Sequence, residues 1–194
     1  MPILHLLAGP NGSGKSTYVR HVIAPIADLP FVKADVIAAA RWPQAQLEHA
    51  YDASRAAEGE RQRLLADRKS FISETVFSHR SKVDLVGQAV RLGYIVHLHV
   101  LLIPVELSVA RVADRVSEGG HDVPERKIRE RYDRLWSLIA QARGLADRTE
   151  ILDNSSAATP FRVVATYEHG ELVGTASWPT WTPAALGDAA GTRE

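Results

Sequence analysis

Residues 9–16 have the composition of a phosphate-binding loop, because they read GPNGSGKS and match the pattern GxxxxGK[ST] in full. Glycines in such a loop let successive backbone N–H groups turn inward around one phosphate, where side chains would block the surface. Lys15 is then expected to contact the β and γ phosphates of ATP, and the Ser16 hydroxyl to bind Mg²⁺. The predicted nucleotide-binding residues of this loop are Gly9, Pro10, Asn11, Gly12, Ser13, Gly14, Lys15, Ser16 and Thr17.

The sequence around the loop supports the same interpretation. Residues 3–8 (ILHLLA) form a short apolar run typical of a buried strand, and residues 16–23 carry apolar side chains at helical spacing. The pattern requires a strand before the loop and a helix after it. The amino end of that helix would add partial positive charge beside the phosphate.

Several motifs of other nucleotide-binding proteins are missing from the sequence. No [NT]KxD segment is present to read guanine, which argues against a GTPase switch. No LSGGQ-like stretch occurs, and the apolar residues 97–103 end in Pro104 rather than in paired acids. An ABC or AAA motor would therefore lack its water-activating residue. A small phosphotransferase remains.

Asp35 ends a second predicted strand, residues 31–35, and is the candidate catalytic base. Phosphoryl transfer requires a group that accepts the proton of the attacking hydroxyl beside the γ phosphate. The alternative for Asp35 is a cap on the helix predicted for residues 36–40, a role that Asp often fills.

Glu74 and Thr75 end a third predicted strand, residues 70–75. An acid and a hydroxyl there can pair the hydroxyl groups of a polar acceptor once water has left. The alternative is that the two residues cap the next turn.

Arginines cluster around the glycine-rich segment 119–122, which separates two predicted helices. Two helices joined in this way can close over a triphosphate as a lid, and arginines on the lid would stabilise the charge of the transferred group. Arg111 and Arg115 lie four residues apart on one helical face, and Arg131 follows the segment.

His97 and His99 share one face of the strand predicted for residues 94–103. Such a pair could suggest a metal site. Two neutral histidines in a sheet covered by helices are more typical of structural groups, which is the interpretation we adopt.

Strands and helices alternate along the chain, which predicts an α/β fold of three layers around a mostly parallel, five-stranded sheet. In such sheets ligands bind at the carboxyl ends of the strands, where the loop, Asp35 and Glu74 would meet. We expect a core at residues 1–160 that includes a helical lid at about 105–147. A C-terminal β-hairpin, residues 161–180, would pack on this core, and residues 183–194 would form a flexible tail.

Composition is that of one ordinary soluble domain. The 194 residues include 23 basic and 23 acidic side chains and no cysteine, which excludes disulfides and thiolate zinc sites. The net charge of +0 argues against nucleic acid as a partner. No apolar run approaches the roughly 18 residues needed to span a membrane, so we expect a cytoplasmic protein.

Five segments in the same order resemble the zeta-toxin-like P-loop kinases. They are GPNGSGKST, FVKADVIAAARWP, FISETVFSH, RVADRVSEGGHDVPERKIRERYDRL and ILDNSS, and together they span about residues 3–156. The GGHDVPE block is the most specific part, and it places the chain in a short, GGH-containing branch of the family.

The resemblance implies a P-loop kinase fold and an ATP- and Mg²⁺-dependent kinase. Zeta toxins phosphorylate the 3′-hydroxyl of the amino sugar in UDP-N-acetylglucosamine and pair with a small helical antitoxin. Carried over by motif, the resemblance makes Lys15 and Ser16 the nucleotide and metal contacts and Asp35 the base. Glu74, Thr75 and His121 would contact the acceptor. Arg115 and Arg131 would bind the γ phosphate, and Asp153 and Asn154 would lie near the adenine.

The sequence also departs from characterised zeta toxins, which are longer and have sequence before the loop. Lys33 stands where related sequences often have Asn. A nucleotide sugar is the leading small-molecule acceptor. The alternatives are a kinase for a nucleoside, an antibiotic or a polynucleotide end, and an ATP-binding regulatory module without an acceptor.

Overall fold

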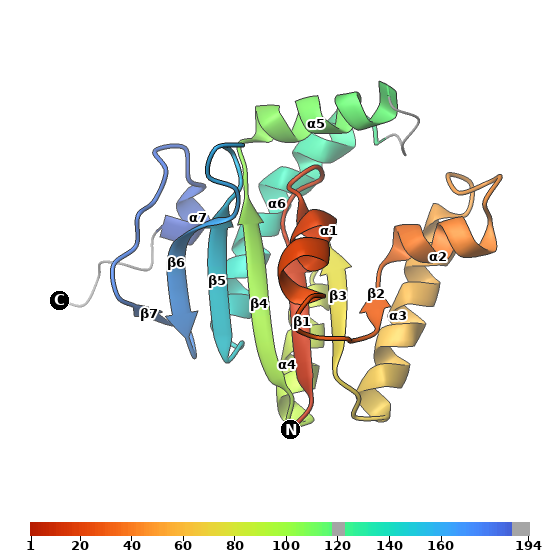
Figure 1. Cartoon of the computed structure of the whole chain (residues 1–194), viewed down its shortest axis with the longest axis horizontal. Helices are drawn as coiled ribbons and strands as arrows, with labels where there is room; N and C mark the ends of the chain where they lie inside the picture. Colours follow the sequence, from red (N-terminus) through yellow and green to blue (C-terminus); the bar gives the residue numbers. More distant parts are fainter. Residues whose placement is uncertain (118–122, 188–194) are drawn as a thin grey trace.

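The computed structural model describes residues 1–117 and 123–187 and contains a seven-stranded sheet in the order β2-β3-β1-β4-β5-β6-β7 (Figure 1). The first five strands in this order are parallel, and β6 and β7 continue the sheet antiparallel. The strands are β1 (Ile3–Ala8), β2 (Phe31–Val32), β3 (Phe71–Thr75), β4 (Ile95–Leu102), β5 (Arg148–Asp153), β6 (Arg162–Glu168) and β7 (Glu171–Val173).

The predicted count of five strands is wrong, because the C-terminal hairpin joins the sheet. His169 and Gly170 connect β6 to β7 with φ angles of 49° and 82°, a two-residue turn suited to antiparallel strands. β6 then pairs with the outer edge of β5, which removes that edge from solvent. The turn is visible in the sequence, whereas the free edge of β5 depends on strand order.

Helices cover the two faces of the sheet unequally. Behind the sheet in Figure 1, α4 and α6 pack against the alternate side chains of the central strands and form the larger core. The smaller core on the opposite face is covered by α1 and η1. The helices are α1 (Lys15–Tyr18), the π-helical turn η1 (Val19–Ile23), α2 (Ala34–Arg41), α3 (Ala50–Ala66), α4 (Ser81–Arg91), α5 (Val105–Ser117), α6 (Glu125–Arg143) and α7 (Ala184–Gly187).

The predicted flexible tail is wrong for its first residues. Residues 184–187 form α7, in which Leu186 is fully buried, and its carbonyl accepts a hydrogen bond from Arg143 Nη1 at 3.2 Å. The remaining tail, residues 188–194, lies outside the described residues. Among the described helices, none is long and apolar enough to cross a membrane.

Because the strands are parallel, three polar segments of the chain lie at one edge of the sheet. The loop after β1, the start of α2 and the end of β3 all lie at the carboxyl edge, and α5 runs across the top of that edge in Figure 1. The register pairs Ala8 with Thr75, so the loop and the end of β3 are adjacent. This edge therefore carries the candidate site.

Candidate active site

The loop after β1 has the conformation that the pattern predicts. Gly9, Gly12 and Gly14 have φ angles of 146°, 69° and 91°, a region that side-chain-bearing residues rarely adopt. A Cβ atom on Gly9 would lie 2.5 Å from the Leu101 carbonyl oxygen, and one on Gly14 would lie 2.5 Å from Asn154 Nδ2. The glycines are therefore required both by the backbone turn and by close packing.

Lys15 is buried at the centre of the loop. Its Nζ donates hydrogen bonds to the carbonyl oxygens of Gly9 at 2.9 Å and Pro10 at 2.7 Å, with Ser13 Oγ at 3.4 Å. Burial lowers the pKa of the ammonium group from 10.5 to about 8, and nearby Glu74 partly opposes this shift. A phosphate would supply the negative charge that this buried group lacks.

Ser16, Lys33, Asp35 and Glu74 form a polar cluster next to the loop. Ser16 Oγ donates to Glu74 Oε2 at 2.7 Å and accepts a hydrogen bond from Lys33 Nζ at 2.6 Å. The same ammonium lies 3.6 Å from Asp35 Oδ2 and 3.6 Å from Glu74 Oε1. The start of α1, the start of α2 and the end of β3 thus place one cation among three oxygen-bearing side chains.

This cluster fits a magnesium ion. Mg²⁺ prefers oxygen ligands, and Ser16 with the two carboxylates supplies them. The Lys33 ammonium lies among these oxygens, so the group already surrounds one positive charge. Ser16 would hold the ion, with Glu74 and Asp35 as the neighbouring carboxylates.

Asp35 is not the cap of α2. The capping position is Lys33, and Asp35 is the second residue of the helix, with a side chain that is 61% exposed. The carboxylate is therefore available to a ligand. Thr75 does serve the alternative role, because its Oγ1 accepts a hydrogen bond from Phe77 N at 3.1 Å, while it also borders the cavity described next.

A cavity of about 630 Å³ connects the loop with this cluster and with the arginines of α5 and α6. Asp35 and Glu74 supply its carboxylates, and Arg115 and Arg131 reach it from the two helices. Arg111 also braces the loop, because its Nη1 donates to Gly12 O at 3.3 Å and its Nη2 to Asn154 O at 3.0 Å. The predicted site residues that line the cavity are Asn11, Gly12, Ser13, Gly14, Lys15, Ser16, Thr17, Asp35, Glu74, Thr75, Arg111, Arg115 and Arg131.

Some predicted site residues stand behind the loop instead. Asn154 Nδ2 donates to Ser13 O at 2.9 Å, and Asp153 pairs with Arg162 at 3.0 Å. Both residues are buried and neither lines the cavity, so their contact with adenine stays a prediction. Gly9 and Pro10 contribute the carbonyls that hold Lys15. His121 lies outside the described residues.

Arg61 and Lys82 also line the cavity and were not predicted from the sequence. Arg61 is 4% exposed, and its Nη2 donates to Glu58 Oε2 at 2.7 Å, while Lys82 Nζ lies 3.3 Å from the same oxygen. These two cations and Gln62 hold the pKa of Glu58 at about 2, against the opposing effect of burial. No local motif marks either residue, because α3 and α4 meet only in the fold.

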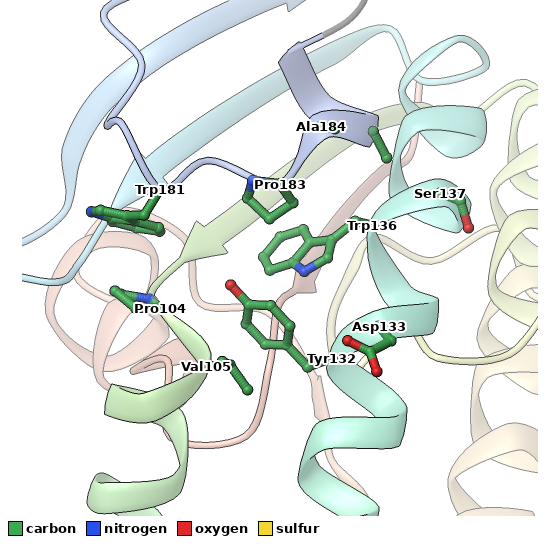
Figure 2. A pocket seen from close by; sticks show the side chains of 10 residues that line it. Pro104, Val105, Tyr132, Asp133, Trp136, Ser137, Trp181, Pro183 and Ala184 are labelled. Atoms are coloured by element: carbon green, nitrogen blue, oxygen red, sulfur yellow. The ribbon is translucent and has the colours of Figure 1, made fainter.

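A second hollow, of about 460 Å³, has a different character. Figure 2 shows Tyr132 and Trp136 projecting from α6 toward the segment that carries Trp181 and Pro183. Within residues 1–117 and 123–187, the one charged residue that lines it is Asp133, so these residues offer no cation to a phosphate there. The larger cavity is therefore the candidate active site.

A family profile described as an AAA domain matches residues 4–136, which includes the loop, Asp35, Glu74 and all of α5. The chain belongs to this AAA domain family. An uncharacterized protein of Haemophilus influenzae is 32% identical over 128 residues, which are 64% of this chain and 88% of that protein. The match describes a domain rather than an activity, so the argument against an AAA motor stays a prediction.

Solved structures show the same fold. The AvrRxo1-ORF1:AvrRxo1-ORF2 complex with sulphate ions has a TM-score of 0.70 at 18% identity, covering 89% of this chain and 60% of that one. The same complex has been solved with ATP, with a TM-score of 0.63. This chain thus spans about three fifths of the length of the AvrRxo1 chain that it matches.

Two further structures extend the likeness. The PezAT toxin-antitoxin system of Streptococcus pneumoniae has a TM-score of 0.62 at 16% identity, covering 86% of this chain and 72% of that one. Shikimate kinase from Acinetobacter baumannii has a TM-score of 0.54 at 20% identity, covering 82% and 87%. The predicted zeta-toxin-like P-loop kinase fold is confirmed.

Proposed function

We propose that this protein is a Mg²⁺-dependent kinase that transfers the γ phosphate of ATP to a hydroxyl group of a small polar acceptor. The observation that carries the proposal is that the phosphate loop and Asp35 line the same cavity. Lys33 connects them, because its ammonium contacts both Ser16 and Asp35. A carboxylate so close to the phosphate loop can meet an alcohol beside the γ phosphate.

The residues of the cavity divide the work of phosphoryl transfer. Lys15 and the loop N–H groups bind the phosphates, and Arg115 and Arg131 neutralise the charge that develops on the transferred group. Asp35 accepts the proton of the acceptor hydroxyl, while Glu74 and Thr75 orient the acceptor. Mg²⁺ held at Ser16 would supply further neutralisation of the phosphate oxygens.

The charges of the cavity favour an acceptor that is itself an anion. Among the described residues, its basic lining outnumbers its two carboxylates, Asp35 and Glu74, by five. The basic residues are Lys15, Lys33, Arg61, Lys82, Arg111, Arg115 and Arg131. Arg61 and Lys82 come from α3 and α4, whereas the arginines of the lid come from α5 and α6. A nucleotide sugar, which carries phosphates of its own, matches this distribution better than a neutral sugar.

Transfer of label from γ-labelled ATP to a panel of nucleotide sugars, nucleosides and aminoglycosides tests the proposal. We expect label on a nucleotide sugar, with UDP-N-acetylglucosamine as the first compound to try. Asp35→Asn should lower kcat by about 10²- to 10⁴-fold and leave ATP affinity within about twofold, because the base acts on the acceptor and not on the nucleotide.

The control is Asp28→Asn, which changes an exposed carboxylate outside the cavity and should leave kcat unchanged. A regulatory ATP-binding module would bind ATP but label no member of the panel, and that result would reject the proposed kinase. Equal kcat values in Asp35→Asn and Asp28→Asn would reject Asp35 as the base.

A further inference from the structure

Three histidines meet on the sheet face opposite the larger core. His97 and His99 lie on β4, and the register places His5 of β1 directly opposite His97. Alternate residues of a strand point to the same face, so all three side chains share the thinly covered side, where α1 and η1 are the covering helices. The sequence shows only the pair on β4, for which it favours a structural role, because β1 and β4 are almost ninety residues apart in the chain. The third histidine, His5, is the observation that changes this interpretation.

The ring nitrogens of this cluster lie at distances suited to one shared ion. His5 Nδ1 and His99 Nε2 are 3.1 Å apart, and one nitrogen from each of the three rings lies within 4.8 Å of the others. Nitrogen ligands at about 2.0–2.1 Å from a tetrahedral Zn²⁺ would be slightly more than 3 Å apart. His5 and His99 share a hydrogen bond at nearly this spacing, which a metal ion would replace. The ring of His97 stands edge-on to that of His5, with centroids 5.2 Å apart.

Glu150 of β5 lies on the side of the His99 ring that faces away from His5. Its Oε2 lies 3.7 Å from His99 Nδ1, and its Oε1 accepts a hydrogen bond from Arg148 at 2.9 Å. A histidine that ligates a metal commonly directs its other ring nitrogen toward a carboxylate, which fixes the tautomer. At 3.7 Å, Glu150 Oε2 and His99 Nδ1 are not hydrogen-bonded, and His99 Nδ1 is a buried nitrogen without a hydrogen-bond partner among the described residues. A proton on Nδ1, which the nearby carboxylate favours, would leave the lone pair of His99 on Nε2, the nitrogen that faces His5.

An ion could reach this cluster from solvent. His99 is buried, whereas His5 and His97 are only half-buried. The neighbouring cation, Arg148, is paired with Glu150 at 2.9 Å and with Glu168 at 3.2 Å, which offsets its repulsion of a metal ion. Tyr18, at the junction of α1 and η1, packs over His99 with ring centroids 5.5 Å apart and covers the site from the side of the phosphate loop.

We propose that His5 Nδ1, His97 and His99 Nε2 bind one divalent transition-metal ion, for which Zn²⁺ is the best candidate. Glu150 is the carboxylate that orients His99. Three imidazoles suit Zn²⁺, Co²⁺, Ni²⁺ or Cu²⁺ and are poor ligands for Mg²⁺ and Ca²⁺, which prefer oxygen. A water molecule would fill the fourth position. The site is separate from the magnesium cluster at Ser16 and does not depend on the proposed kinase activity.

Titration calorimetry with Zn²⁺ on the full chain, in excess Mg²⁺ to fill the oxygen cluster, tests the site. We expect one equivalent to bind, and Co²⁺ to give the visible absorption of a tetrahedral nitrogen site. His5→Gln and His97→Gln should each weaken Zn²⁺ binding by at least about 10²-fold, since each removes one of three ligands. Glu150→Gln should weaken it by about tenfold, as expected for a carboxylate behind a ligand.

His21→Gln is the matched control, because His21 is exposed on η1 and outside the cluster. It should leave Zn²⁺ affinity unchanged. Thermal unfolding without metal checks that each variant folds, and a Zn²⁺-dependent rise in the Tm of the wild type tests the site without any variant. Absence of that rise, or an equal loss of affinity in His21→Gln and His5→Gln, would overturn the proposal.

Discussion

The two halves of the main cavity are built in different ways. The half that we propose for the nucleotide, called the nucleotide half, is one contiguous segment, residues 9–17, which offers mostly backbone N–H groups and one buried lysine. The half that we propose for the acceptor, called the acceptor half, is assembled from side chains on α2, α3, β3 and α4. Backbone N–H groups can bind the phosphates of any nucleoside triphosphate, whereas the specificity of a surface made of side chains can change by single substitutions.

Their electrostatics differ as well. In the nucleotide half, Lys15 donates only to neutral oxygens of its own loop, so its charge is available to a phosphate. In the acceptor half, Lys33 lies among carboxylates, and Arg61 and Lys82 share Glu58. In the proposed kinase, the nucleotide half would therefore contribute mainly binding and charge neutralisation, and the acceptor half would contribute discrimination.

Lys15→Ala is the strongest test of the nucleotide half. We expect kcat to fall by about 10³-fold, because a preorganised cation at the transferred phosphate is lost, and ATP affinity to fall with it. Steady-state kinetics with ATP and the best acceptor of the panel measure both quantities. The acceptor KM should change little.

Lys69→Ala is the control, because Lys69 is an exposed lysine between α3 and β3 and does not line the cavity. A melting curve of Lys15→Ala checks that the loop tolerates the loss of its hydrogen bonds to Gly9 and Pro10. Full activity in the folded Lys15→Ala variant would show that this loop is not the phosphate site.

Arg61→Gln tests the acceptor half and should have a smaller, more selective effect. We expect the KM for a nucleotide-sugar acceptor to rise by about 10- to 10²-fold, since hydrogen bonds to charged groups contribute about 1.5–3 kcal/mol. The Kd for ATP should stay the same. Arg63→Gln, on the exposed face of the same helix, is the matched control.

The comparison of charged and uncharged acceptors makes this test specific. An acceptor without phosphates should have the same KM in the wild type and in Arg61→Gln. If ATP affinity falls as much as acceptor affinity, Arg61 belongs to the nucleotide half, and the proposed division of the cavity is wrong.

The same division explains which residues of the candidate site could be predicted from the sequence alone. Lys15 and Ser16 were predictable because the loop is local, and Asp35 and Glu74 because the carboxyl ends of parallel strands meet at one edge. Arg61 was not predictable, since it looks like one more charged residue on a long helix. Only the packing of α3 against the sheet buries it and turns it toward the cavity.

Strand order has the same consequence elsewhere in the molecule. The hairpin turn at His169 and Gly170 is a local signal, yet its pairing with β5 depends on which edge of the sheet remains free. His5 meets His97 only because β4 lies next to β1. Long-range adjacency is therefore the information that periodicity and motifs lack.

Lys15 also predicts a pH dependence that is confined to the nucleotide half. Burial lowers its pKa to about 8 in the free protein, and the phosphates of ATP favour the charged form and raise the pKa in the complex. ATP affinity should therefore be constant below about pH 7 and weaken above pH 8, by roughly tenfold between pH 7 and pH 9.

Equilibrium titrations with ATP at several pH values measure this change, and Lys15→Met serves as the control because it cannot titrate. Its weaker affinity should not vary over the same range. An equal fall in both proteins would assign the titration to another group. The acceptor KM should lack this dependence, because Lys15 belongs to the nucleotide half and not to the surface proposed for the acceptor, so the two halves of the cavity should respond to pH separately.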